Sequence, residues 1–183
     1  MTQTKTSGVG MDVDSLLQLP EDEFARQCKF EAFKSGGPGG QKRNKTSSAV
    51  KWTHVATGIS AHSSDFRLQA ENRVRALHRL RVKLATDTRR PIDVRGYEPP
   101  AWLSDSRVQG KLTTNTKNPL YARLAAHVLD VFDASGARVS DAAALVGIPT
   151  SNLVHFLQAD HTVWAAASRM RSARQLPPLS TGR

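Results

Sequence analysis

The sequence predicts an α+β fold, in which a small antiparallel sheet with a packed basic helix is followed by an irregular linker and an all-α, helix-turn-helix-like C-terminal region. Three observations support this prediction. Short stretches between residues 28 and 62 alternate between apolar and polar side chains, as half-buried strands do. The next 20 or so residues place an apolar side chain at every third or fourth position, as a helix does. After a stretch rich in Pro and Gly, residues 119–172 have a helical pattern throughout.

The N-terminal part of the chain is expected to contain the strands. Residues 1–27 form an acidic segment, in which Pro20 interrupts a short helix whose first turn is rich in carboxylates. The strands are expected at residues 28–33, 49–55 and 59–62. A tight turn at Ala56-Thr57-Gly58 joins the last two as a hairpin.

The basic helix follows the hairpin, and Ser63, Ser64 and Asp65 are candidates for its N-cap. The apolar side chains that keep the helical spacing are Phe66, Ala70, Val74, Leu77, Leu80 and Leu84. Arginine and lysine occupy the other faces of the helix. The strands and this helix define an expected domain over residues 28–88.

Residues 89–117 are expected to be an irregular linker, because five Pro and Gly residues interrupt any regular pattern. Tyr97 and Trp102 are expected to anchor it to a neighbouring surface. A helical domain follows over residues 118–176, with a tail over 177–183. Its helices are expected to begin at Asn118-Pro119, at Ser140, at Thr150 or Ser151 and at about Asp160, and the second ends near Gly147. Residues 143–153 have helix-turn-helix spacing.

The positive charge is concentrated in one part of the chain. Residues 34–90 contain 13 Lys and Arg but three Asp and Glu, and this excess equals the whole formal net charge of +10. A charge confined in this way predicts a polyanionic partner, most simply a nucleic acid. A solvated helix face is the alternative, and the lack of a Trp- or Phe-rich apolar face argues against a membrane-surface role.

The stretch from Ser35 to Lys45 is the most informative one for chemistry. It is rich in glycine, as a flexible linker is, but it ends in Gln, Asn and three basic residues. It is not a nucleotide-binding P-loop, because Gln41 precedes Lys42 and Arg43 follows, so no Gly-Lys-Ser/Thr closes the loop.

This loop resembles the catalytic loop of class I peptide chain release factors and of the shorter rescue-type hydrolases related to them. Ser35 to Gln41 fits the small-Gly-x-Gly-Gly-Gln frame of that family, and Asn44-Lys45 fits its Asn-Lys pair. The resemblance continues over about residues 28–86. It includes Thr53-His54-x-x-Thr57-Gly58-Ile59 in the hairpin and Arg67-x-Gln69-x-x-Asn72-Arg73-x-x-Ala76-Leu77 in the helix.

The resemblance implies hydrolysis of the ester between a peptide and tRNA inside the ribosome. Gly39, Gly40 and Gln41 would then be the catalytic residues: the glycines let the loop enter a narrow RNA cavity, and the backbone N–H of Gln41 stabilises the developing oxyanion. The side-chain amide of Gln41 would position water, since an amide is no general base near neutral pH. Ribosomal RNA contacts are expected from Lys42, Arg43, Lys45, Arg67, Arg73, Arg75, Arg79 and Lys83. Arg43 departs from the small apolar residue that is usual there.

The remaining residues favour a rescue-type hydrolase that acts without a codon. Only 38 residues precede Gly39, which is too few for a decoding domain, and no stretch resembles the tripeptide motifs of stop-codon readers. We therefore expect a cytoplasmic protein, monomeric off the ribosome, whose partners are the ribosome and peptidyl-tRNA. No membrane, sequence-specific DNA, cofactor or metal is expected; the helix over 151–158 contains no Lys or Arg, and the histidines lack metal-ligand spacing.

Two hypotheses from different classes stay open. The first is codon-independent peptidyl-tRNA hydrolysis on stalled ribosomes. The second is a non-catalytic ribosome- or RNA-binding protein derived from the same domain. An intact Gly-Gly-Gln triplet favours the enzyme, because a pure binding protein needs no such loop. Recruitment by a truncated message, a damaged decoding centre or a separate partner is compatible with the sequence.

Overall fold

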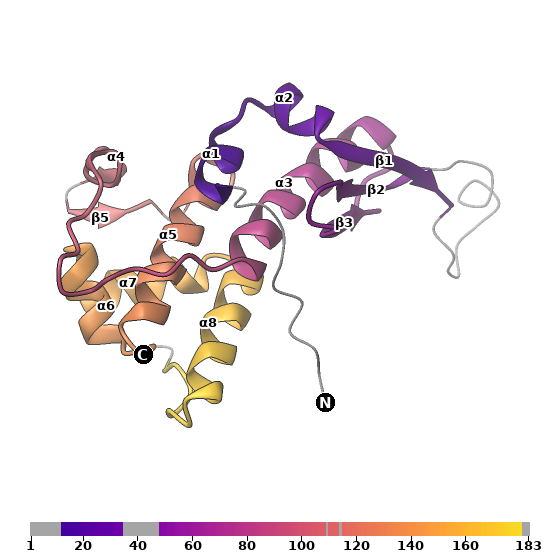
Figure 1. Cartoon of the computed structure of the whole chain (residues 1–183). Helices are drawn as coiled ribbons and strands as arrows, with labels where there is room; N and C mark the ends of the chain where they lie inside the picture. The colour runs from indigo at the N-terminus through magenta and orange to yellow at the C-terminus, as the bar shows by residue number, and fades with distance from the viewer. Residues whose placement is uncertain (1–11, 35–47, 109, 114, 181–183) are drawn as a thin grey trace.

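A computed structural model gives the structure of the protein and describes residues 12–34, 48–108, 110–113 and 115–180. Figure 1 shows the sheet at one end of the molecule and the C-terminal helices at the other, with the long helix α3 between them. The first predicted helix is split as expected, into α1 (Val13–Gln18) and α2 (Glu21–Arg26), with Pro20 between them. The observed fold is therefore the predicted α+β arrangement.

The sheet contains three antiparallel strands in the order β1-β2-β3. Their bounds are Cys28–Phe33, Ala49–His54 and Ser60–Ser63, close to the prediction. Gly58 has a φ of +69°, which few other residues adopt, and its N–H donates to the carbonyl of His54 at 2.9 Å. The hairpin turn at residues 56–58 is thus confirmed. At the other end of the sheet, Phe33 pairs with Ala49, the residues nearest the glycine-rich segment.

Helix α3 (Gln69–Asp87) begins later than predicted. Its N-cap is Leu68, which makes no side-chain cap, because Ser63 and Asp65 are engaged in contacts with residues of α3 itself. The predicted stripe holds only in the second half of the helix. Leu77, Leu80 and Leu84 are buried, whereas Phe66 and Val74 are 44% and 55% exposed and Ala70 is also exposed. The first half of the predicted stripe is therefore wrong.

The second half of α3 lies inside a core that the whole fold shares. On one side it contacts β2 and β3, and on the other it packs on α5 (Tyr121–Ala134) and α8 (His161–Ala173). The buried apolar side chains form one cluster that extends from α1 through the sheet to α8. The sheet and the C-terminal helices consequently hold one another in place.

The C-terminal helices follow the predicted order. Between α5 and α8 lie α6 (Val139–Val146) and α7 (Thr150–Gln158). Gly147 ends α6 in the left-handed region, and the Asp160 carboxylate caps α8. Only the start of α5 differs. The Asn118 side chain accepts from the N–H of Leu120 in a turn, and the helix begins at Tyr121.

The linker has more regular structure than its Pro and Gly content predicts. It contains the short helix α4 (Ala101–Asp105) and a hairpin of β4 (Arg107–Val108) and β5 (Lys111–Leu112). The expected aromatic anchors are confirmed. The Tyr97 hydroxyl is hydrogen-bonded to Nε2 of His127 at 2.7 Å, and the ring of Trp102 contacts the same imidazole edge-on. The linker is therefore clamped to α5 by a buried histidine.

A buried carboxylate fixes the beginning of the linker. Asp130 on α5 is 2% exposed and accepts from Nη1 of Arg89 at 2.8 Å, and from both the backbone N–H and Nε of Arg90 at 3.1 Å. Burial nevertheless raises the pKa of Asp130, against the lowering by the two arginines.

Among the described residues, every helix is too short or too polar to span a bilayer.

The histidine clamp predicts a pH-dependent stability. Burial, and then the charge of Arg90, lowers the pKa of His127 from 6.5 to about 4. The unfolded chain binds a proton at this residue before the folded chain does, so the free energy of unfolding should fall as the pH falls from about 6.5 to 4. The loss should reach about 3 kcal/mol. Urea unfolding at several pH values in this range measures the free energy of unfolding. This free energy should change less with pH for His127→Gln than for the native protein, and an equal change in both would contradict the assignment.

Candidate functional site

The glycine-rich segment connects neighbouring strand ends. The predicted catalytic residues Gly39, Gly40 and Gln41 lie outside the described residues, as do the predicted RNA contacts Lys42, Arg43 and Lys45. The described chain leaves β1 at Lys34 and returns at Ser48, next to the paired residues Phe33 and Ala49. We call Lys34 and Ser48 the loop root, because they join residues 35–47 to the sheet.

One buried side chain fastens the loop root to α3. Asn72 is fully buried, and its Nδ2 donates to the carbonyl of Ser48 at 2.9 Å and to that of Phe66 at 2.8 Å. Its Oδ1 accepts from the hydroxyl of Ser63 and from the N–H of Phe66, both at 3.0 Å. All four bonding positions of the amide are used. Asn72 therefore joins the loop root, the end of β3 and the start of α3.

Little in the sequence predicts the role of Asn72. The residue occurs in the matched helix motif, but no predicted site includes it. The available signal was a short polar residue on the helix face that carries Ala76 and Leu80, four and eight positions further on. A polar residue on a buried face needs bonding partners, and those partners come from segments up to 24 residues away in the sequence.

The five described basic residues predicted to contact RNA fall into different groups. Arg67 and Arg73 are exposed, and no described carboxylate pairs with them. The Arg73 guanidinium lies over the rings of Phe30 and Trp52, 5.2 and 5.3 Å from their centroids. Trp52 also donates its indole N–H to the Arg73 carbonyl at 3.1 Å. Arg73 is therefore held on the aromatic edge of the sheet with its charge uncompensated.

Arg75 and Arg79 share a single carboxylate. Both oxygens of Asp65 accept from Arg79, at 3.2 and 2.7 Å, and Nε of Arg75 lies 3.7 Å from the same carboxylate. Two cations and one anion leave one positive charge in this group. Lys83 donates to the carbonyl of Ser60 at 3.0 Å, so its ammonium is turned toward the hairpin.

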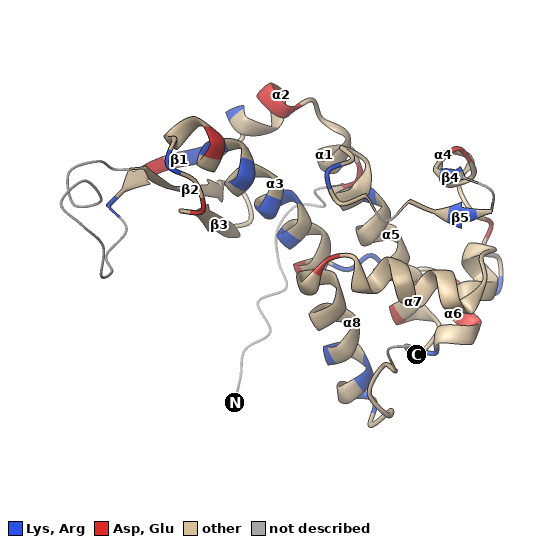
Figure 2. Ribbon diagram, turned by 180° about the vertical axis from the view of Figure 1, so that it is seen from behind, with Lys and Arg blue, Asp and Glu red and all other residues tan. Residues whose placement is uncertain are grey.

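Other arginines of the basic region have structural roles. Arg81 donates to the carbonyls of Leu17, Leu19 and Pro20 and lies 4.3 Å from the Phe24 ring centroid, which docks the N-terminal segment on α3. Figure 2 shows the cationic residues of α3 distributed along the helix rather than gathered at one end. Exposed charge without a described carboxylate partner is found at its start, close to the loop root.

Two titratable side chains of the sheet are unsuited to acid–base or nucleophilic chemistry. Burial raises the pKa of the Cys28 thiol to about 11, and its Sγ–H donates to the carbonyl of Phe24. Burial lowers the pKa of His54, whose Nδ1 is hydrogen-bonded to the Thr57 hydroxyl at 2.9 Å. Both lie at the end of the sheet opposite the loop root.

Comparison with known proteins gives a family for this part of the chain. Residues 19–98 match the family described as the RF-1 domain, and the match covers the sheet, α3 and the loop root. These residues are therefore similar to the catalytic domain of class I release factors. The expectation drawn from the loop and helix motifs is confirmed at the level of the family.

Curated relatives of this release factor domain carry the name peptide chain release factor 1. The protein from Thermoanaerobacter pseudethanolicus is 54% identical over 83 residues, which is 45% of this chain and 22% of that protein. The one from Symbiobacterium thermophilum is 47% identical over 66 residues, 36% of this chain and 17% of that protein. The one from Bifidobacterium adolescentis is 39% identical over 83 residues, 44% and 23% of the two chains. The chain thus spans about a fifth of the length of these relatives.

The hydrogen bonds of the Asn72 amide predict that removing this side chain destabilises the protein. Asn72→Ala should lower the free energy of unfolding by about 3 kcal/mol, because it leaves buried donors and acceptors without partners. Ser63→Ala is the matched control, since it removes one bond to Asn72 and leaves the bond to Ser48 intact; about 1 kcal/mol is expected. Urea unfolding measures both. Equal losses in the two variants would show that the amide is no more than one hydrogen bond among many.

Because no described carboxylate pairs with Arg73, we expect this residue to contribute to RNA binding. The logarithm of the affinity for ribosomal RNA should fall with the logarithm of the salt concentration, and Arg73→Gln should reduce that slope by about 1. Arg26→Gln should leave the slope unchanged, because Arg26 is also exposed but pairs with Asp22 on the acidic helix α2. Filter binding over a series of salt concentrations measures the slopes. A larger effect of Arg26→Gln would contradict the assignment.

Proposed function

We propose that the chain hydrolyses the ester of peptidyl-tRNA on the ribosome and so releases the peptide. The observation that carries the proposal is the match of residues 19–98 to the RF-1 domain, with Gly39-Gly40-Gln41 inside the matched range. Release factor 1 is the name of the relatives that share this region. Translation termination is the process in which such a domain acts.

The proposed mechanism depends on placement. The exposed cations Arg67 and Arg73 dock the start of α3 on RNA phosphates, and Asn72 carries that position to the loop root through Ser48. The backbone N–H of Gln41 then faces the oxyanion, and its side-chain amide orients water. The tRNA ribose and ribosomal RNA complete the reacting site. Lys42, Arg43 and Lys45 bind RNA beside the triplet.

We further propose that release does not require a stop codon. No stretch of the printed sequence resembles the tripeptide motifs of stop-codon readers. Two arginines near the C-terminus serve the fold instead of forming a free basic tail. Arg171 donates to the carbonyls of Ala137 and Pro177, and Arg174 pairs with Asp133 at 2.7 Å. Recruitment to stalled ribosomes would then depend on the helices α5–α8 or on a partner.

We also propose that the protein works in the cytoplasm, as a monomer when it is off the ribosome. The positive charge concentrated in residues 34–90 and the absence of a membrane-spanning helix among the described residues are compatible with this proposal.

A non-catalytic ribosome-binding protein is the second candidate. The exposed arginines at the start of α3 would serve it equally well, since phosphate contacts require no reaction. The two candidates differ in the loop: only a hydrolase depends on the backbone at Gly40.

Peptide release from ribosomes stalled on a truncated message separates the candidates. Gly40→Ala should lower the release rate about 10²–10³-fold, because it disturbs the oxyanion donor, and should leave ribosome affinity unchanged. Gly96→Ala is the control, because no atom lies within 4 Å of an added Cβ there. Release by the native protein with a normal rate for Gly40→Ala would place the chemistry elsewhere. Binding without release by the native protein would favour the second candidate.

A further inference from the structure

A small pocket lies where α3 packs on the start of α8. Its volume is about 180 Å³, below the ~300–1,000 Å³ of pockets for drug-sized ligands. It therefore has room for a small group rather than for a whole nucleotide. The polar side chains that line it include Arg75, His78 and Arg79 from α3 and Asp160, His161 and Thr162 from α8 or its N-cap.

The two arginines of the pocket share one ion-pair partner among the described residues. Arg75 and Arg79 have only Asp65 as a described carboxylate partner, and Asp65 approaches from outside the pocket lining. Each guanidinium has five N–H donors, and the bonds to Asp65 and to the His62 carbonyl occupy only some of them. Guanidinium N–H donors therefore remain for a ligand.

The carboxylate inside the pocket is already engaged. Oδ1 of Asp160 accepts from the backbone N–H of Thr162 at 2.7 Å and from that of Val163 at 3.4 Å. This is an N-cap, and the positive end of the α8 dipole offsets much of its charge. Asp160 consequently opposes an anion less than a free carboxylate would.

The pKa of His78 reflects the charges around the pocket. It is half-buried, and burial lowers its pKa first, followed by the charge of Arg75. Asp160 raises the pKa by less than Arg75 lowers it, and Arg79 and Arg81 add to the lowering. His78 is thus neutral at pH 7 in the free protein, and an anion beside it would favour its protonated form.

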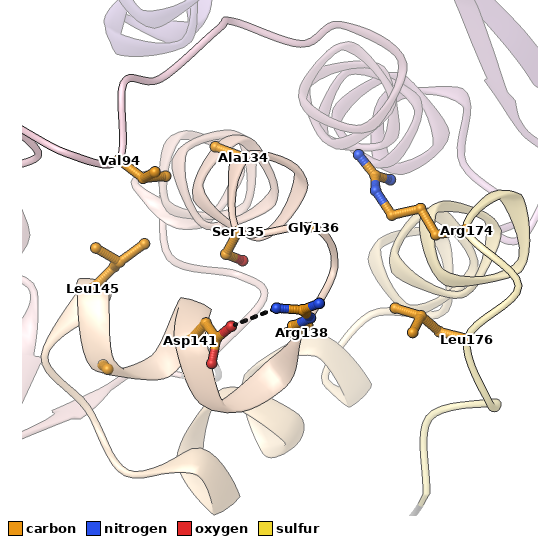
Figure 3. A pocket seen from close by; sticks show the side chains of 10 residues that line it. Val94, Ala134, Ser135, Gly136, Arg138, Asp141, Leu145, Arg174 and Leu176 are labelled. Atoms are coloured by element: carbon orange, nitrogen blue, oxygen red, sulfur yellow. Dashed lines mark ion pairs between the residues drawn. The ribbon is translucent and has the colours of Figure 1, made fainter.

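A second pocket provides a contrast. Figure 3 shows this pocket from close by, with lining side chains such as Ser135, Asp141 and Arg174. Its volume is about 770 Å³. It also contains two arginines, but each has a carboxylate of its own. Arg138 pairs with Asp141 at 3.8 Å, and Arg174 pairs with Asp133 at 2.7 Å. Cationic side chains alone therefore do not distinguish the α3–α8 pocket. Its two arginines differ in that they share one carboxylate, Asp65, while Asp160 is bonded to backbone N–H groups.

We propose that the α3–α8 pocket binds one phosphate group of an RNA backbone, with the guanidinium N–H groups of Arg75 and Arg79 and the ring of His161 as its donors. The inference rests on the proposed function only for the origin of the RNA. It adds a contact that includes α8, which lies outside the part of the chain that matches the release factor family. The C-terminal helices would thereby help to orient the catalytic domain on RNA.

Nuclear magnetic resonance on the full chain tests the pocket. The ring signals of His78 and His161 should shift, with saturation, when inorganic phosphate or a short single-stranded RNA is added. An uncharged methylphosphonate analogue of the same RNA should not move them. His155, exposed on α7, is the internal control. Affinity should rise as the pH falls, because a bound phosphate raises the pKa of His78.

Two variants sharpen the test. Arg75→Gln should weaken phosphate binding about tenfold, the effect of one charge-assisted hydrogen bond. Arg138→Gln, in the pocket of Figure 3, should leave it unchanged. His161→Gln, an exposed position that tolerates substitution, should also weaken it and guards against misfolding of the first variant. Equal weakening by Arg138→Gln, or shifts that grow without saturation, would overturn the proposal.

The outcome is independent of the hydrolase test. Gly40→Ala leaves the pocket intact, so it should bind phosphate as the native protein does. Peptide release without phosphate binding would overturn the pocket alone. Phosphate binding without release by the native protein would overturn the hydrolase alone.

Discussion

The hydrogen bonds of Asn72 are the constraint on which the functional end of the molecule depends. A buried amide is costly unless every donor and acceptor finds a partner, and here the partners are the Ser63 hydroxyl, the carbonyl of Ser48 and both backbone groups of Phe66. The observed arrangement satisfies all four bonding positions of the amide. Strand β3, the start of α3 and the loop root are thereby held together, so the loop root has a fixed position on the sheet.

The basic residues of the chain have several different roles in the structure. Thirteen cations in residues 34–90 predict a polyanion partner, but the structure assigns many of the described ones to other tasks. Arg81 docks the N-terminal segment, Arg89 and Arg90 neutralise the buried Asp130, and Lys83 is turned toward the hairpin. The exposed charge near the loop root has no described carboxylate partner, and the proposed function assigns this charge to RNA. A count of basic residues therefore overstates the positive charge that is available to bind a polyanion. The count also does not show where on the surface that charge lies.

The sequence predicted the elements of the fold well where local patterns determine them. The alternating strands, the turn at Gly58, the helix end at Gly147 and the helix start at about Asp160 are local features, and all were found. The start of α3 was wrong because Ser63 and Asp65 bind side chains 9 and 14 residues away instead of capping a helix. The family of the site came from its motif. The role of Asn72 and the α3–α8 pocket depend on contacts between distant segments, which no periodicity records.

The single core around α3 has a consequence for how the chain can be divided. The face of α3 that carries Leu80, Leu84 and Ala85 is fully buried, and α5 and α8 cover the helix on the side away from the sheet. A fragment cut at residue 98 would expose that apolar face to water and would require a substitute cover. The region that matches the RF-1 domain and the C-terminal helices therefore behave as one folding unit, because neither part buries its apolar face without the other.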